Sequence, residues 1–172
     1  MRADARRNRR RITDAALALL GERGPDVPME DIARAAGVGV GTLYRHFPDR
    51  RALLEEVAAG TLRDILAFGR RQDAPDRDGW DALLRVVRHC AGLPLALVKT
   101  LAAEAAPPER LALQQEVTAL LAGLAGRAQK EGALRADLTP DQVVEVVSAL
   151  VCRPGARADD ALAVVVLDGL RR

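Results

Sequence analysis

The stretch Asp31-Ile-Ala-Arg-Ala-Ala-Gly-Val-Gly-Val-Gly-Thr-Leu-Tyr-Arg-His-Phe47 decides the fold, because its apolar spacing predicts two short helices separated by a tight turn. The apolar residues recur at helical spacing and would face each other across the turn: Ile32, Ala33 and Ala36 in the first helix, Leu43 and Phe47 in the second. Between the helices, Gly37 can adopt the left-handed conformation that ends a helix. Pro48 ends the second helix, so the pattern indicates a helix-turn-helix.

The second of these helices presents a surface that suits the major groove of DNA. Its outward residues are Val40, Gly41, Thr42, Tyr44, Arg45 and His46. Val40 and Gly41 offer no side-chain hydrogen bonds, so specificity would depend on Tyr44, on Thr42, on DNA shape and on the arginine-rich arm of residues 2–11. Two alternatives stay open, because the Tyr44 ring could serve a small core and His46 could be an ordinary surface residue.

Positive charge is concentrated at the N-terminal end. Residues 1–51 contain eleven arginines and seven acidic residues, a balance of +4, whereas the whole chain of 172 residues carries +2. The remaining 121 residues therefore carry −2. A basic segment joined to a slightly acidic body is typical of a nucleic-acid reader attached to another domain, although a solvated charged face is an alternative.

Residues 2–11 hold six of these arginines, one acid and no apolar run. Such a composition predicts an arm that is disordered until it meets a polyanion. The arm could follow phosphates or enter a minor groove, and its candidate DNA contacts are Arg6, Arg7 and Arg10.

Apolar residues recur at helical spacing along the rest of the chain, and no run alternates long enough to predict a sheet. The fold class is therefore all-α, with a three-helix DNA-binding domain over residues 1–48 and a helical domain over residues 49–172. We predict helices at approximately residues 10–21, 29–36, 40–46, 49–69, 80–91, 94–105, 109–131, 140–151 and 161–170. Asp49 and Thr139 are the expected N-caps of two of them.

Several classes of protein are disfavoured by what the sequence contains. The two cysteines, Cys90 and Cys152, lack the spacing of a zinc site, and the two histidines fall in different predicted domains. There is no P-loop or nucleophile elbow, so we expect neither an enzyme nor a metal or other cofactor. No apolar segment reaches the roughly 18 residues of a membrane span, and no signal peptide is evident, which favours a cytoplasmic location.

From Arg10 to about Leu54 the chain resembles the TetR family of transcriptional regulators. The resemblance is carried by residues at fixed spacings: Ile12, Ala15, Ala16, Leu19 and Gly21, then Met29-Glu-Asp-Ile-Ala-Arg-Ala-Ala-Gly-Val38, then Gly41-Thr-Leu-Tyr-Arg-His-Phe-Pro-Asp-Arg50 and Leu53. It implies that Val40, Gly41 and Tyr44 face base edges while Thr42, Tyr44 and His46 reach phosphates. Arg50 stands where the family usually has a phosphate-binding lysine.

Two positions depart from the family's pattern. Pro28 replaces a common threonine that caps the second helix and often binds a phosphate. Gly39 replaces a frequent serine at the next N-cap, which weakens that cap by a few tenths of a kcal/mol. Affinity should therefore depend on arginines and backbone groups, and it should fall steeply with salt.

For the second domain the resemblance implies a helical ligand-binding domain whose last two helices pair with those of a second subunit. This agrees with two closing helices that are apolar around most of their circumference, although burial in the core is an alternative. The candidate dimer contacts are Val143, Val144, Val147, Leu150, Val151, Leu162, Val165 and Val166.

The resemblance also implies a ligand pocket between the middle helices, and scarce aromatic residues favour an aliphatic one. The candidate lining residues are Phe68, Trp80, His89, Cys90, Leu97, Leu101, Val117 and Leu121, with Glu104 and Gln114 as further guesses. His89 could equally be a core histidine with its hydrogen bonds satisfied.

The sequence therefore predicts a homodimeric regulator, most often a repressor in this family, that binds a palindromic double-stranded DNA operator. A small, mostly apolar effector would release it. The alternatives are a helical dimeric interaction protein and a DNA-binding regulator without a small-molecule effector.

Overall fold

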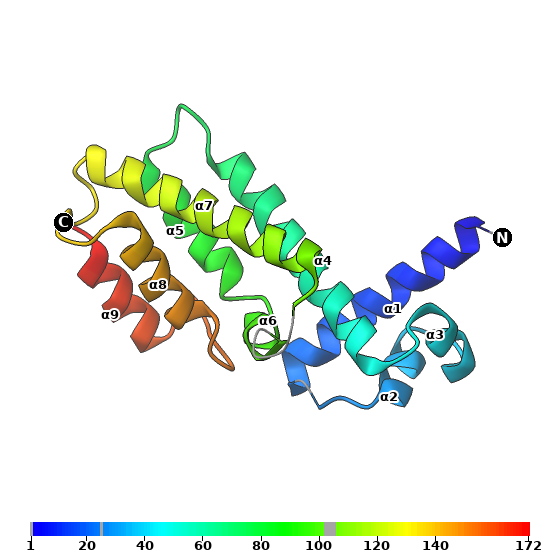
Figure 1. Cartoon of the computed structure of the whole chain (residues 1–172). Coiled ribbons are helices and arrows are strands. Elements are labelled where there is room, and N and C mark those ends of the chain that lie inside the picture. Colours follow the sequence, from blue (N-terminus) through cyan, green and yellow to red (C-terminus); the bar gives the residue numbers. More distant parts are fainter. Residues whose placement is uncertain (1, 25, 102–105) are drawn as a thin grey trace. The chain divides into compact units, whose positions relative to one another are not determined.

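The computed structural model describes residues 2–24, 26–101 and 106–172, which form nine α-helices (Figure 1). The helices are α1 (Arg2–Arg23), α2 (Met29–Ala35), α3 (Val40–His46), α4 (Arg50–Gln72), α5 (Gly79–Cys90), α6 (Leu95–Leu101), α7 (Pro108–Lys130), α8 (Pro140–Val151) and α9 (Ala161–Leu170). The all-α prediction is confirmed. Residues 102–105, which include the candidate Glu104, lie outside the described part.

The helices group into two compact units, residues 1–60 and residues 61–172. The division falls inside α4, whereas the sequence pattern placed the domain boundary before this helix, at residue 48. The continuous helix α4 thus begins in the first unit and ends in the second.

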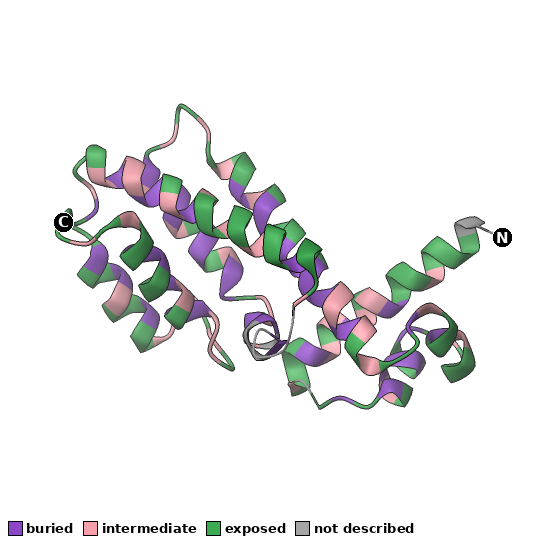
Figure 2. Cartoon of the chain, viewed as in Figure 1, coloured by how far each residue is buried: buried purple, intermediate pink, exposed green. Residues whose placement is uncertain are grey.

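In the first unit, α1, α2 and α3 pack around an apolar centre. Its fully or almost fully buried residues are Ile12, Ala16, Leu20, Ile32, Ala33, Leu43, Phe47 and Leu53. They include the facing residues of the predicted helix-turn-helix, and Figure 2 shows the alternation of buried and exposed positions along these helices. The core therefore fixes which side of α3 is turned to solvent.

The prediction of a disordered N-terminal arm is wrong, because α1 is helical from Arg2 onward. Arginine is a good helix former, and ion pairs spaced three or four residues apart support the first turns. Asp4 pairs with Arg7 at 2.5 Å, and Arg10 pairs with Asp14 at 3.7 Å. Two of the arginines that were expected to keep this segment unfolded thus have acidic partners within the helix.

In the second unit, α7 packs against both α5 and α8, and α9 packs against α8. The central buried residues are Leu83, Val86, Val87, Leu121, Leu124, Ala125, Ala128, Val143 and Val147. At the start of α5, a Cβ on Gly79 would lie 2.5 Å from the backbone nitrogen of Ala128. Only glycine allows α5 and α7 to approach so closely.

Side chains cap the N-terminal ends of α4, α5, α8 and α9 by accepting hydrogen bonds from backbone N–H groups of the first turn. The predicted N-caps Asp49 and Thr139 are confirmed, because they accept bonds from the backbone N–H groups of Ala52 (2.7 Å) and Gln142 (3.2 Å). Gln142 also accepts from the Thr139 N–H at 2.8 Å, which completes a capping box. α5 and α9 are capped in the same way, by Asp78 and Asp160.

Candidate nucleic-acid interface

Helix α3 exposes one polar face while its other face is anchored in the core. Leu43 and Phe47 are buried, whereas Tyr44 keeps 42% of its surface exposed and Val40 keeps 37%. The remaining predicted contacts lie on the same short helix: Gly41 and Arg45 exposed, Thr42 and His46 half-buried. A rigid helix with an exposed tyrosine and arginine can present these groups to base edges and phosphates.

The turn before α3 depends on one glycine. Gly37 has φ +62°, the left-handed conformation that was predicted for it. The N–H of Val38 donates to the carbonyl of Ala33 at 3.0 Å, and this bond closes the end of α2. Arg11 donates to the Gly37 carbonyl at 3.2 Å, and a Cβ on Gly37 would lie 2.4 Å from Arg11 Nη2. Helix α1 therefore holds the turn through Arg11.

Arg9 joins the C-terminal end of α3 to both flanking helices. Its guanidinium lies over the Phe47 ring, 4.4 Å from the ring centroid, and donates to the His46 carbonyl at 3.2 Å. The same group pairs with Glu56 of α4 at 2.5 Å. Sequence reasoning counted Arg9 among the basic arm residues, and nothing in the linear pattern marked its role in positioning α3.

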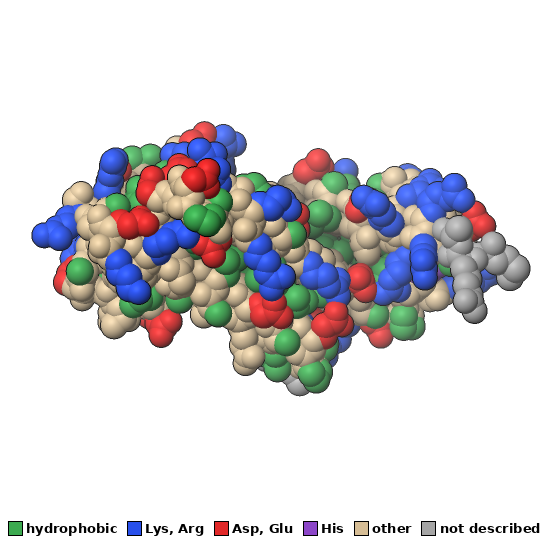
Figure 3. Space-filling view, turned by 90° about the horizontal axis from the view of Figure 1, so that it is seen from above, with side chains coloured by type: hydrophobic (Ala, Val, Ile, Leu, Met, Phe, Trp, Pro, Cys, Tyr) green, Lys and Arg blue, Asp and Glu red, His purple; other side chains and the backbone are tan. Residues whose placement is uncertain are grey.

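Many arginines of the first unit serve the fold as well as supplying charge. Arg23 and Arg34 pair with Asp31, and Arg50 donates to the Val27 carbonyl. The predicted phosphate ligand Arg50 is therefore half-buried against the loop that precedes α2. Figure 3 shows the Arg side chains of this unit spread over its visible face with acidic groups among them.

The other predicted basic contacts are accessible. Arg6, Arg7, Arg10 and Arg45 are all exposed. The ion pairs of Arg7 with Asp4 and of Arg10 with Asp14 lie at the surface, where such a pair contributes at most about 1 kcal/mol. These arginines can exchange their carboxylate partners for DNA phosphates at small cost.

The predicted dimer contacts divide into two groups. Val143, Val144, Val147, Leu150 and Val151 of α8 are already buried within the single chain. Their apolar spacing reflects packing inside the second unit, so they leave little surface for a partner. Leu162 and Val165 of α9 are exposed, by 49% and 68%, and Val166 is half-buried.

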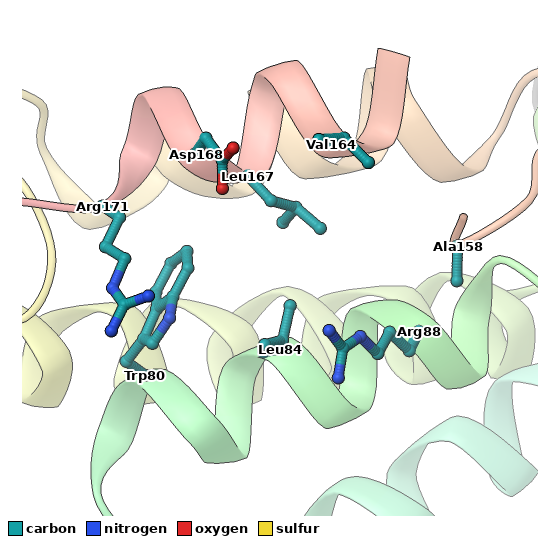
Figure 4. Close-up of a pocket in the computed structure, with 8 residues that line it drawn as sticks. All are labelled: Trp80, Leu84, Arg88, Ala158, Val164, Leu167, Asp168 and Arg171. Carbon is teal, nitrogen blue, oxygen red and sulfur yellow. The ribbon is translucent and has the colours of Figure 1, made fainter. Parts of the chain in front are cut away.

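A pocket of about 180 Å³ lies between α5 and α9 (Figure 4). It is lined by Trp80, Leu84, Arg88, Ala158, Val164, Leu167, Asp168 and Arg171. Of the predicted ligand residues, only Trp80 belongs to it. The other lining residues were not predicted as ligand contacts, because α5 and α9 are far apart in sequence.

The other predicted ligand residues take different places. Phe68 stacks on the His89 ring at a centroid distance of 4.1 Å, and His89 Nε2 lies 2.6 Å from an Asp64 carboxylate oxygen. The structure therefore gives His89 the satisfied role that was the alternative to ligand binding. Cys90, Leu101 and Leu121 are buried, Val117 and Gln114 are half-buried, and the side chain of Leu97 lies outside the described part.

Two features of the described residues bear on other functions. No group of three or more His, Cys, Asp and Glu side chains in that part of the chain is arranged to hold a metal ion. Among the same residues, no helix has both the length and the apolar character that crossing a membrane requires.

Comparisons with known proteins agree with this geometry. Residues 12–57 match the family described as bacterial regulatory proteins, tetR family, and residues 78–172 match the SbtR-like transcriptional regulator C-terminal domain. A TetR transcription regulatory protein of Mycobacterium vanbaalenii shares 34% identity over 99% of both chains, with a TM-score of 0.69. A TetR transcriptional regulator of Streptomyces coelicolor shares 29% identity over 95% of this chain and 98% of its own, also with a TM-score of 0.69.

A shorter match links the chain to curated regulators. An HTH-type transcriptional regulator of Staphylococcus aureus is 48% identical over 54 residues, which are 31% of this chain. The match spans only 29% of the length of that relative. The similarity to this relative is therefore confined to part of each chain.

Proposed function

Because this chain belongs to the TetR family of bacterial transcriptional regulators, we propose that it binds a palindromic operator as a homodimer and represses transcription. The family consists of regulators rather than enzymes, and its members bind operator DNA and effector ligands. The observation that carries the proposal is the exposed face of α3, held between a buried apolar side and the Arg9 contacts.

Each subunit would place α3 in a major groove, with the two half-site centres about one helical turn, roughly 34 Å, apart. Tyr44, Val40 and Gly41 would face base edges, which favours contacts with thymine methyl groups over hydrogen bonds. Thr42, His46 and the exposed arginines would contact phosphates. Pro28 is the N-cap of α2 and forms no side-chain cap, so a hydroxyl contact to phosphate is lost there.

Dimerisation would use the exposed side of α9. Leu162 and Val165 project from this side, with the small residues Ala161 and Gly169 also exposed on it. Val146 of α8 adds a further exposed apolar group, at 37%. A second copy of the chain would cover these groups and align two α3 helices on one DNA face.

The functional division we propose assigns residues 1–48 to DNA binding and residues 49–172 to effector binding and dimerisation. A small effector in the second domain would favour a dimer whose α3 helices no longer fit both grooves. Helix α4, which continues from one unit into the other, would transmit this change. The effector must then bind the DNA-free form more tightly than the bound form.

The test is selection of duplexes from a random DNA library, followed by fluorescence anisotropy with wild type and Tyr44→Ala. The wild type should enrich a palindromic sequence, and Tyr44→Ala should lose affinity for it while remaining a folded dimer. Arg157→Ala, which removes an exposed arginine from the second unit, is the control and should bind as wild type. A chain that is only monomeric at micromolar concentration would contradict the proposal.

A further inference from the structure

We infer that the pocket between α5 and α9 is a binding site for a small carboxylate with an aromatic or branched aliphatic body. The inference concerns a site in the second unit, and its occupancy can be measured without DNA. Only its regulatory consequence rests on the proposed function.

Two helical stripes form the walls of this pocket (Figure 4). Trp80, Leu84 and Arg88 recur every four residues along α5, so they lie on one face of that helix. On α9 the facing residues are Val164, Leu167 and Asp168, again at helical spacing, and Arg171 follows directly after the helix in extended conformation. Between the stripes, the middle of the pocket is apolar, and its polar groups stand toward the ends.

The charges favour an anion at the Arg88 end. Within the described part of the chain, neither Arg88 nor Arg171 has an ion pair or a side-chain hydrogen bond, whereas their neighbour Arg85 pairs with Asp81 at 2.7 Å. Asp168 lies on the side of Trp80 and Arg171, so it offsets the positive charge there and leaves Arg88 in excess.

The acidic residues that follow Ala158, at the Arg88 end, are already paired with arginines. Ala158 closes the pocket beside Arg88, and the two residues that follow it are acidic. Asp159 pairs with Arg157, and Asp160 pairs with Arg153 while capping α9. A ligand carboxylate next to Arg88 would therefore meet a guanidinium that has no competing partner.

The size of the pocket limits the ligand. An apolar cavity of about 150 Å³ in another protein accommodates benzene. A volume of about 180 Å³ therefore admits one six-membered ring or a short branched chain together with a carboxylate. Long acyl chains and nucleotides would extend beyond this pocket.

The wall formed by α9 is held in place before any ligand arrives. Arg135 donates its backbone N–H to Leu170 at 3.0 Å and its side chain to the Gly169 carbonyl at 3.1 Å. The N–H of Arg172 donates to Ala133 at 3.2 Å. Such preorganisation lowers the entropic cost of binding, because the wall need not be ordered by the ligand.

Trp80 is the only tryptophan of the chain, so its fluorescence reports occupancy of this pocket directly. The full-length protein is titrated with phenylacetate and with 4-methylpentanoate, and phenylacetamide serves as the uncharged match of the first. We expect a saturable change with at least one carboxylate. Because Arg88 is exposed, Arg88→Gln should weaken that binding by up to about fivefold, the loss of a surface ion pair worth at most about 1 kcal/mol, and Arg85→Gln should leave it unchanged.

Three results would overturn the inference. The first is the absence of a saturable change with either carboxylate up to about 10 mM, the range of very weak binding. The second is equal affinity for phenylacetamide, and the third is equal weakening by Arg88→Gln and Arg85→Gln. Circular dichroism of each variant confirms folding, and operator affinity is measured in a separate assay. Failure of the carboxylate site and failure of DNA binding are thus told apart.

Discussion

Arg9→Ala is expected to weaken operator binding although Arg9 lies on α1 rather than on α3. The substitution removes the contact with the Phe47 ring, the bond to the His46 carbonyl and the ion pair with Glu56. A cation over an aromatic ring contributes about 0.5–1 kcal/mol. The partly exposed hydrogen bond to His46 and the ion pair with Glu56 contribute at most about 1 kcal/mol each. Because such terms are not additive, we expect a total of about 1–2 kcal/mol per chain.

If two chains bind one operator, both lose these contacts, so the binding free energy weakens by about 2–4 kcal/mol in total. That corresponds to a loss of at least about thirtyfold in affinity. Fluorescence anisotropy on the selected duplex measures this loss, and urea unfolding measures the share that appears as stability of the free protein. The operator affinity of Arg9→Lys should fall between those of wild type and Arg9→Ala. An ammonium keeps the charge but lacks the planar guanidinium that can contact several partners at once.

Arg6→Ala is the matched control, since it removes one arginine from the same helix without removing a described ion pair or hydrogen bond. It should reduce affinity only through the lost charge, with a shallower salt dependence. If Arg9→Ala weakens binding no more than Arg6→Ala does, Arg9 acts as a charge and does not position α3.

Other substitutions test the turn at Gly37, the exposed side of α9 that we propose as the dimer surface, and the buried thiol of Cys90. Gly37→Ala should destabilise the protein by about 1–2 kcal/mol in urea unfolding, because its φ of +62° is left-handed. Gly21→Ala, in open space within α1, should instead be stabilising. Val165→Glu should yield a folded monomer by analytical ultracentrifugation, whereas Ala136→Glu should remain dimeric; two dimeric variants would exclude α9 as the interface. Burial raises the pKa of Cys90 from 9.0 to about 12, so the unfolded chain loses this proton first and stability should fall as the pH rises above 9. Cys90→Ala should reduce that slope, and an unchanged slope would assign it to other groups.

The helix-turn-helix could be predicted because its determinants are local. Apolar spacing defined the buried faces, Gly37 supplied the turn, and the bounds predicted for α3 agree with the structure. Asp49 and Thr139 were predictable as caps for the same reason, since a cap bonds to a backbone group three residues away.

Features that depend on distant residues could not be predicted in this way. The basic segment was expected to be disordered, because its composition does not reveal that Arg9 would bond to His46 and Glu56, 37 and 47 residues away. The pocket likewise combines α5 with α9, so only Trp80 was anticipated among its lining residues.

The proposed dimer surface illustrates a further ambiguity. A valine-rich helix such as α8 has the same sequence pattern whether it packs inside its own chain or against a partner. The structure buries Val143 and Val147 almost completely and leaves Val165 exposed, a difference that follows from how α8 and α9 pack together. The pattern of apolar residues therefore located the helices but did not separate the two kinds of contact.

The most direct test of the proposed function is hydroxyl-radical footprinting of the full-length protein on its selected duplex. Two chains with α3 in successive major grooves predict two protected windows on one face of the DNA, with centres about one turn, roughly 34 Å, apart. Tyr44→Ala should abolish both windows together at protein concentrations that saturate the wild type. A single window, or protection that does not depend on Tyr44, would contradict the account.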